Sequence, residues 1–523
     1  KGAGSMQTDT KAGTKGGVRE FSRKRRLMNQ AGSIVNFYCS DVEFICYWVP
    51  YFDIDSDYGR YIEKVNPRDT YLSAAVQCGN GIRILRQDLW EMIITFLISQ
   101  QNNISRIRSC IERLCVRYGE KLKAGDKVYT VGMKKIIALF HIGQDDISEG
   151  MNILGAHIDS PRLDVKQNPL YEDTDLAYLD THYYGGVKKY QWVTLPLAIH
   201  GVVVKKDGST AEVNIGEDED DPIVYITDLL IHLAGKQMQK KAAEVIEGEN
   251  LDILIGSRPL KDLEDDKKKE AVKQNVLNIL KEKYDMEEED FLSAELEIVP
   301  AGKARECGLD RSMIAAYGQD DRVCAYPSFE AIAAMEKPEI TSVCLLVDKE
   351  EIGSVGASGM QSRFFENTVA EVMNAAGTYS ELALRRALKN SSVLSSDVSA
   401  AFDPNFPSVM TKRNAAYFGR GLVFNKYTGA RGKSGSNDAN AEYVGALRAI
   451  MDRNEVSFQT AELGKVDQGG GGTIAYILAN YGMRVIDSGV AVLNMHAPWE
   501  ATSKADIYET KCGYVAFLEK ACL

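Results

Sequence analysis

Two adjacent carboxylates, Glu350 and Glu351, follow a run of apolar residues in the sequence. Residues 343–347 are apolar or β-branched and predict a buried strand, which leads into Asp348, the Glu pair and a glycine turn. Buried carboxylates are unfavourable unless a positive partner lies opposite them. In open α/β sheets, ligands bind in the crevice beyond the strand ends. A Glu pair alone is more often a solvated turn, so its interpretation depends on what else the chain places beside it.

Four further strand-to-turn segments carry imidazole or carboxylate groups. These groups are His157 with Asp159, Asp320 with Asp321, Asp397, and His496. Carboxylates and imidazoles, with no cysteine at these positions, form a ligand set suited to zinc, manganese or cobalt. One bridging carboxylate flanked by His, Glu, Asp and His is what a two-metal hydrolase requires. Such a site lowers the pKa of a water molecule and leaves one free Glu to accept its proton.

Residues from about 121 to 523 resemble the aminopeptidase I / aspartyl aminopeptidase family of dinuclear zinc exopeptidases. The resemblance rests on six motifs in the family's order, GAHIDSPRLD, THYYGG, GQDDRV, DKEEIGS, SSDVSAAFDPN and NMHAP. It covers roughly four fifths of the chain, and agreement of all six motifs by chance is very improbable. The resemblance implies an α/β fold, in which a mixed-sheet zinc exopeptidase domain is interrupted by a β-rich dimerisation domain.

The resemblance also implies a role for each candidate site residue. It implies two Zn²⁺ ions per subunit, or Co²⁺ or Mn²⁺ in their place. One ion would be held by His157, Asp320 and Asp397, and the other by Asp320, Glu351 and His496. Glu350 would be the general base, and Asp159 would orient His157. Asp320 fits the bridging position better than its neighbour, with Asp321 as the alternative.

The composition excludes several classes of protein. The 523-residue chain is 45% hydrophobic and 26% charged, which is typical of a globular protein of two or three domains. A net charge of -12 argues against general nucleic-acid binding. Ten cysteines without a CxxC pair indicate buried thiols in a reducing cytoplasm. No apolar run is long enough for a membrane span and the first thirty residues show no secretory signal, so we expect a cytoplasmic protein.

The amino-terminal part differs from the rest. Residues 1–33 are Gly-rich and basic and predict a disordered tail. Residues 34–118 resemble the first part of an 8-oxoguanine DNA glycosylase, an α+β fragment, through the run LRQDLWEMIITFLISQQNNISRI. The match ends near Gly119, and nothing after it supplies the catalytic lysine and aspartate of that family. The sequence therefore predicts a fusion in which this fragment is not a functional glycosylase.

The peptidase part divides into 121–165 with 309–523 as the catalytic domain and 166–308 as the β-rich domain. In the latter, YITDLLIHLAG resembles the family segment whose histidine reaches a neighbouring active site, which would make His232 a substrate-binding residue supplied in trans. The alternative is a half-buried helix histidine. The run at 261–270 predicts a solvated helix face. The four glycines at 469–472 lack the Lys-Ser/Thr of a phosphate loop and predict a close backbone approach at a pocket wall.

The function predicted from these observations is a metal-dependent aminopeptidase that cleaves amino-terminal residues from peptides. The resemblance implies a homo-oligomer built from dimers, dodecameric in relatives. Two alternatives remain at this stage: a glycosylase-like DNA-binding fusion, or a two-metal carboxypeptidase or deacylase. The sequence does not distinguish acidic from neutral amino-terminal residues as substrates.

Overall fold

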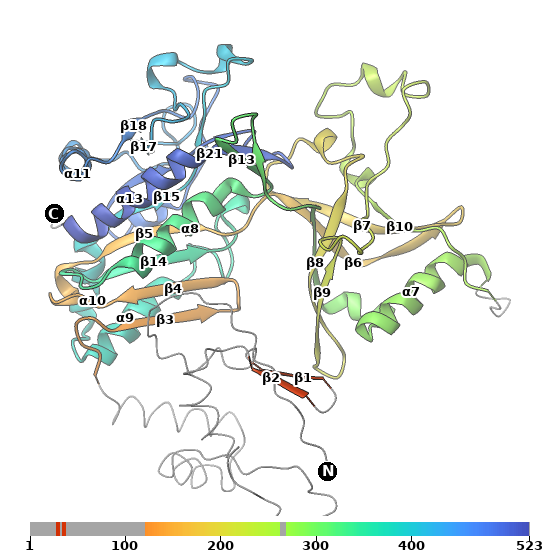
Figure 1. The fold of residues 1–523 in the computed structure, drawn as a ribbon, viewed down its shortest axis with the longest axis horizontal. Coiled ribbons are helices and arrows are strands. Elements are labelled where there is room, and N and C mark those ends of the chain that lie inside the picture. The colour runs from red at the N-terminus through yellow and green to blue at the C-terminus, as the bar shows by residue number, and fades with distance from the viewer. Residues whose placement is uncertain (1–27, 32–33, 38–120, 262–267, 522–523) are drawn as a thin grey trace, which may run out of the picture. The chain divides into compact units, whose positions relative to one another are not determined.

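The computed structural model describes residues 28–31, 34–37, 121–261 and 268–521, and the chain divides into two compact units, Lys1–Glu120 and Lys121–Leu523 (Figure 1). In the first unit, β1 (Met28–Ala31) and β2 (Ile34–Phe37) form an antiparallel hairpin. Strand β1 lies within the range 1–33 that the sequence assigns to a tail. The two helices predicted within 34–118, and with them the glycosylase-like fold, lie outside the described residues.

An eight-stranded mixed sheet forms the centre of the second unit. Its strand order is β18-β17-β19-β15-β5-β14-β4-β3, and β19, β15, β5 and β14 are mutually parallel. These strands are almost entirely buried because helices cover both faces of the sheet. The strand bounds are β3 (Lys127–Gly132), β4 (Ile136–His141), β5 (Asn152–His157), β14 (Ser342–Val347), β15 (Ser392–Ser396), β17 (Leu422–Asn425), β18 (Phe458–Thr460) and β19 (Arg484–Gly489).

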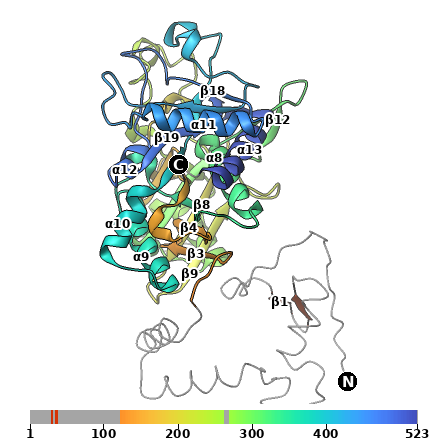
Figure 2. The ribbon, with the colours of Figure 1, turned by 90° about the vertical axis from the view of Figure 1, so that its left-hand side faces the viewer.

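Two helical layers enclose this sheet, as Figures 1 and 2 show. One layer contains α8 (Gln319–Ala334), α11 (Ala441–Arg453) and α13 (Lys504–Lys520), and the other contains α9 (Phe364–Ala376), α10 (Glu381–Asn390) and α12 (Ala475–Ala479). Neighbouring residues of β5 point to opposite layers: Leu154 packs in the core with Phe517, whereas Ile153 packs in the core with Val369. This alternation follows from the period of two along a strand.

A smaller five-stranded sheet supports the loop that carries His496. Its order is β12-β13-β21-β20-β16, and the loop joins β20 to β21. The strands are β12 (Arg305–Cys307), β13 (Met313–Ala316), β16 (Ser399–Ala400), β20 (Ala491–Leu493) and β21 (Glu500–Ser503). Because β16 follows Asp397 and β13 precedes Asp320, three of the predicted ligands are attached to this sheet.

The β-rich domain is a six-stranded antiparallel sheet with the order β10-β7-β6-β11-β8-β9. Helix α7 (Ala271–Tyr284) packs on it, and its core includes Trp192, Leu197 and Ile298. The strands are β6 (Arg162–Asp173), β7 (Leu176–Tyr184), β8 (Leu197–Val204), β9 (Thr210–Ile215), β10 (Ile253–Gly256) and β11 (Ala294–Pro300). The first strand of this domain, β6, begins at Arg162, four residues before the expected start of the domain at 166. Strand β12 belongs to the smaller sheet, although it lies before the expected end of the β-rich domain at 308.

Within the part of the chain that the structure describes, no helix is both long and apolar enough to cross a membrane.

Candidate active site

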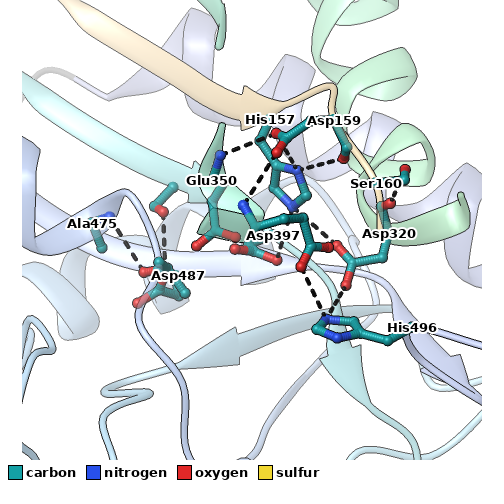
Figure 3. A network of polar contacts seen from close by, with 12 residues as sticks. His157, Asp159, Ser160, Asp320, Glu350, Asp397, Ala475, Asp487 and His496 are labelled. Carbon is teal, nitrogen blue, oxygen red and sulfur yellow. Dashed lines mark hydrogen bonds and ion pairs between the residues drawn. The ribbon is translucent and has the colours of Figure 1, made fainter. Parts of the chain in front are cut away.

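The ends of three parallel strands bring the predicted ligands together. In the pairing of β14 with β5, Val347 lies opposite His157, and in the pairing of β15 with β5, Ser395 lies opposite Gly155. His157 is the last residue of β5, and Asp397 directly follows β15. Each lies two residues beyond the Gly155–Ser395 pair, so the two residues are equally far along their strands. The Glu pair begins η9 (Glu350–Ile352), three residues after β14. Figure 3 shows the side chains of His157, Glu350 and Asp397 close together.

Two triads of possible metal ligands share Asp320. His157, Asp320 and Asp397 form one triad, and Asp320, Glu351 and His496 form the other, with the ligand atoms of each triad within 4.8 Å of one another. Asp320 Oδ1 lies 3.0 Å from His157 Nε2, and its Oδ2 lies 3.3 Å from His496 Nε2. The two oxygens of one carboxylate therefore face the two triads, which is the arrangement of a bridging ligand.

Asp321, the alternative bridging residue, belongs to neither triad. Its side chain is completely buried, and its two carboxylate oxygens have no hydrogen-bond partner among the described residues. Burial raises the pKa of the Asp321 carboxyl well above its ordinary value. Asp320 and Asp321 occupy the first turn of α8, where their backbone angles are not helical. The geometry thus favours Asp320 for the shared position.

The charges of this cluster are unbalanced without a cation. Burial raises the pKa of Glu350 to about 7 and that of Glu351 to about 8, and it also raises the pKa of Asp397. Burial opposes protonation of His496, but Asp320 and Glu351 beside it raise its pKa to about 9. Burial is the largest cause of the raised carboxyl pKa values and the neighbouring carboxylates add to it, so a bound cation would favour the ionised forms of these groups.

The donor atoms fit zinc. Each histidine has its Nδ1 atom engaged by a backbone carbonyl, that of Asp159 at 3.0 Å from His157 and that of Gly186 at 2.9 Å from His496, which leaves Nε2 free to bind a metal. Glu351 Oε1 is buried and has no hydrogen-bond partner within the described part of the chain. Imidazole and carboxylate groups of this kind are ordinary zinc ligands.

Asp159 connects the first histidine to the Glu pair. Its Oδ1 lies 3.3 Å from His157 Nδ1 and accepts the backbone N–H of Glu350 at 3.1 Å. Its Oδ2 accepts the backbone N–H of Glu351 at 3.2 Å and the hydroxyl of Tyr184 at 2.8 Å. Although burial opposes ionisation, these partners lower the pKa of Asp159. The carboxylate therefore orients both a possible ligand and the backbone of η9.

Two contributors to the site were missed by the sequence interpretation. Tyr184 lies at the end of β7, and the only signal for it was its place inside the THYYGG motif. Glu500 accepts the backbone N–H of His496 at 2.8 Å and that of Asp320 at 3.1 Å, so it supports both sides of the second triad. Its position four residues after His496, in the run HAPWE, was the available signal.

His232 is not part of a helix. It lies in an exposed turn of the β-rich domain beside Leu229, Leu230, Ile231 and Leu233, each more than half exposed. The alternative of a half-buried helix histidine is therefore wrong. The other three histidines outside the cluster differ in setting: His141 is buried, His182 is exposed, and His200 contacts Glu217 at 2.9 Å.

An α/β sheet that collects two such triads at the carboxyl ends of its parallel strands defines a metallohydrolase class of protein. The chain belongs to the aminopeptidase I zinc metalloprotease (M18) family, whose family model matches residues 113–518. It is thus a zinc metalloaminopeptidase, as the sequence predicted. The model of the 8-oxoguanine DNA glycosylase N-terminal domain matches residues 23–93, which confirms the second resemblance. The match begins before the expected residue 34 and ends before the expected residue 118, within the run that begins at Leu85.

Relatives with known names and structures agree with this assignment. A "Probable M18 family aminopeptidase 1" from Clostridium acetobutylicum is 68% identical over 400 residues, covering 76% of this chain and 85% of that protein. The crystal structure of aminopeptidase I from the same organism has a TM-score of 0.72 and 61% identity, covering 82% of this chain and 90% of that one. An M18 family structure from Thermotoga maritima has a TM-score of 0.73 and 43% identity, covering 84% of this chain and 100% of that one. These names favour an aminopeptidase over a carboxypeptidase or deacylase.

Proposed function

We propose that this aminopeptidase uses two zinc ions and the Glu350 carboxylate to hydrolyse the first peptide bond of its substrates. The observation that carries the proposal is the position of Asp320, whose two oxygens face two separate ligand triads. His157 and Asp397 would complete one zinc site, and Glu351 and His496 the other. When bound, the zinc ions supply Lewis-acid chemistry that polarises the scissile carbonyl and lowers the pKa of the attacking water.

Glu350 is the proposed general base. Its backbone is held by Asp159, and its side chain belongs to neither triad, so it is not needed as a ligand. Burial raises its pKa to about 7, close to the value at which a base is most effective near neutral pH. Glu350 would accept a proton from the attacking water and pass it to the nitrogen of the leaving amine, which balances the two proton transfers of hydrolysis.

The experiment that tests this proposal compares wild-type protein with Glu350→Gln. Leucyl, glutamyl and aspartyl anilides would be offered to zinc-, cobalt- and manganese-loaded protein and to a chelated control. We expect metal-dependent release of the chromophore by the wild type and a loss of about two to four orders of magnitude in kcat for the variant, because general-base catalysis contributes about that much.

Two further measurements make the result specific. Elemental analysis should find the same two zinc ions per chain in Glu350→Gln as in the wild type, and Glu282→Gln, an exposed change on α7, should be fully active. Near-normal turnover by Glu350→Gln would refute the base assignment, and one zinc ion per fully active chain would refute the two-metal site.

The active form is proposed to be a homo-oligomer in which His232 contacts substrate in a neighbouring subunit. Residues 229–233 expose several large apolar side chains, a surface that another chain would cover. A structure described as the S. cerevisiae mApe1 dodecamer shares the fold at 21% identity with a TM-score of 0.60. The molecular mass in solution, measured by light scattering, would test the assembly: a monomeric active enzyme would contradict it.

A further inference from the structure

The proposed mechanism does not use the buried carboxylate of Asp487. This residue lies in the sheet, two positions before the strand ends that carry His157 and Asp397. Asp487 is in β19, opposite Ser395 of β15, and Ser395 is opposite Gly155 of β5. Aligned residues of parallel strands point to the same face, and so do residues two apart on one strand. Asp487, Ser395 and Gly155 therefore share a face with His157 and Asp397, about 7 Å from them along the strands.

Asp487 joins two segments that are distant in the sequence. Its Oδ1 accepts the hydroxyl of Ser395 at 3.0 Å. Burial raises the pKa of the Asp487 carboxyl to about 6, and the neighbouring Thr473 and Ser395 hydroxyls lower it, which places Thr473 beside this carboxylate. The Thr473 hydroxyl in turn accepts the backbone N–H of Ala475 at 3.3 Å, so its own proton is available to Asp487. Figure 3 shows Asp487 and Ala475 in the same close-up as the metal-ligand cluster. The carboxylate is 1% exposed, and its Oδ2 has no hydrogen-bond partner in the described chain.

Thr473 directly follows the glycine run at 469–472. Only residues 480–483 separate the end of α12 from the start of β19, so α12 ends at the amino edge of the parallel strands and begins toward their carboxyl edge. Ile474, the first residue after Thr473, fills the space beside Gly155, where an added Cβ would lie 3.2 Å from its Cδ1 atom. The glycine run therefore enters this layer from the edge at which the triads lie.

The glycine run is open on one side and closely packed on the other. A Cβ added at Gly470 would lie 2.6 Å from the backbone of Gly429, whereas one added at Gly471 would meet no described atom within 4 Å. Gly471 and Gly472 are exposed. A backbone without side chains, fixed on one side and open on the other, can accept a peptide in close contact.

We propose that Asp487, acting through Thr473 and Ser395, is a positioning residue that holds the glycine run as the substrate-facing wall of the active site. The inference rests on the proposed function for the identity of the substrate, an amino-terminal peptide segment. Loss of the Asp487–Thr473 link releases the run, so substrate binding weakens while the metal ligands stay in place.

The test uses Thr473→Val, which removes the hydroxyl with little change in shape, together with Asp487→Asn and the conservative Thr473→Ser. Matched controls are Thr510→Val and Ser392→Ala, because these buried hydroxyls have no hydrogen-bond partner among the residues described. For Thr473→Val we expect KM to rise about tenfold, with kcat changed by less than about twofold, because one buried hydrogen bond to a charged group is lost. Zinc content stays at the wild-type value, and Thr473→Ser and both controls match the wild type.

Hydrogen exchange of the peptide that contains residues 469–474 provides a readout independent of activity. We expect faster exchange there in Thr473→Val and Asp487→Asn, but not in the controls. Unchanged KM with unchanged exchange would overturn the proposal, and so would a parallel loss of zinc and kcat, because Asp487 would then act on Asp397. If the zinc-loaded wild type cleaved no aminoacyl anilide, the proposed function would fail, while exchange in the same samples would still decide whether Asp487 holds the run.

Discussion

Tyr184→Phe is the most direct test of how the chain supports its metal ligands. The variant removes one hydroxyl, which donates to Asp159 Oδ2 at 2.8 Å, and keeps the ring that packs against the Arg162 guanidinium at 3.8 Å. Asp159 is 5% exposed, so water cannot readily replace the lost donor. Because Asp159 faces the Nδ1 atom of His157, a less well-held carboxylate orients the imidazole less well.

The magnitude follows from the hydrogen bond. A hydrogen bond to a charged group contributes about 1.5–3 kcal/mol, and about 1.4 kcal/mol corresponds to a factor of ten in an equilibrium constant. We therefore expect zinc affinity to fall by roughly 10- to 100-fold, which is also the usual effect of changing a group that supports a metal ligand. Activity at limiting zinc should fall in parallel and recover when zinc is added in excess.

The assay is competition for zinc against a chromophoric chelator, with kcat/KM measured at each free zinc concentration. Tyr183→Phe is the matched control, because the neighbouring side chain is 43% exposed and points away from Asp159 in the alternation of β7. A thermal melt of the metal-free proteins checks that both variants fold. If Tyr184→Phe bound zinc within about twofold of the wild type, the reasoning that Asp159 needs this donor to hold His157 would be refuted.

Three further predictions concern the rest of the site. Glu500→Gln offers only one acceptor oxygen for the backbone N–H groups of Asp320 and His496, so elemental analysis should find less than the wild-type zinc content; full occupancy would show that Glu500 is dispensable. Metal-free protein should melt at lower temperature as pH rises from about 6 to 9. The pKa of Glu351 is about 8 in the folded chain but near 4.3 in an unfolded one, so stability falls as the pH rises between these values. The pKa of His496 is about 9 in the folded chain but near 6.5 in an unfolded one, so the stability that its positive charge contributes is lost over that range. Scanning calorimetry would detect this trend, which zinc should abolish, and a flat profile without zinc would contradict it. His232→Ala should lower kcat/KM without loss of zinc, and mixed oligomers with Glu350→Gln subunits should regain activity if His232 acts in trans; no recovery on mixing would contradict that role.

The sequence was sufficient to locate the residues that form the two triads, because each follows an apolar strand or begins a helix. Parallel strands end at one edge, so His157, Glu351 and Asp397 had to meet once β5, β14 and β15 were adjacent. The family resemblance supplied the assignment of each residue to a metal. The choice of Asp320 over Asp321 needed the structure, since neighbouring residues of one type differ only in the direction of their side chains.

Tyr184 and Glu500 could not be identified by residue type because their roles depend on distant pairings. Tyr184 reaches Asp159 because Arg162 and Tyr184 are paired at the open end of the β6–β7 hairpin, a register that local patterns do not reveal. Glu500 accepts hydrogen bonds from the backbone N–H groups of Asp320 and His496. All residues except proline carry such a group, so residue types do not reveal these partners. His232 shows the reverse difficulty: its leucine-rich surroundings favour a helix in the sequence, but no layer among the described residues covers them, and they form an exposed turn.

The β6–β7 hairpin makes the inserted domain inseparable from the chemistry. One of its strands begins three residues after Asp159, and the other delivers Tyr184 and then the Gly186 carbonyl that holds the ring of His496. A shortened protein with this insertion removed would lose the contacts of Tyr184 with Asp159 and of Gly186 with His496, on both sides of the candidate metal site. The same hairpin therefore connects the β-rich sheet to both histidines, to His157 through Tyr184 and Asp159 and to His496 through the Gly186 carbonyl.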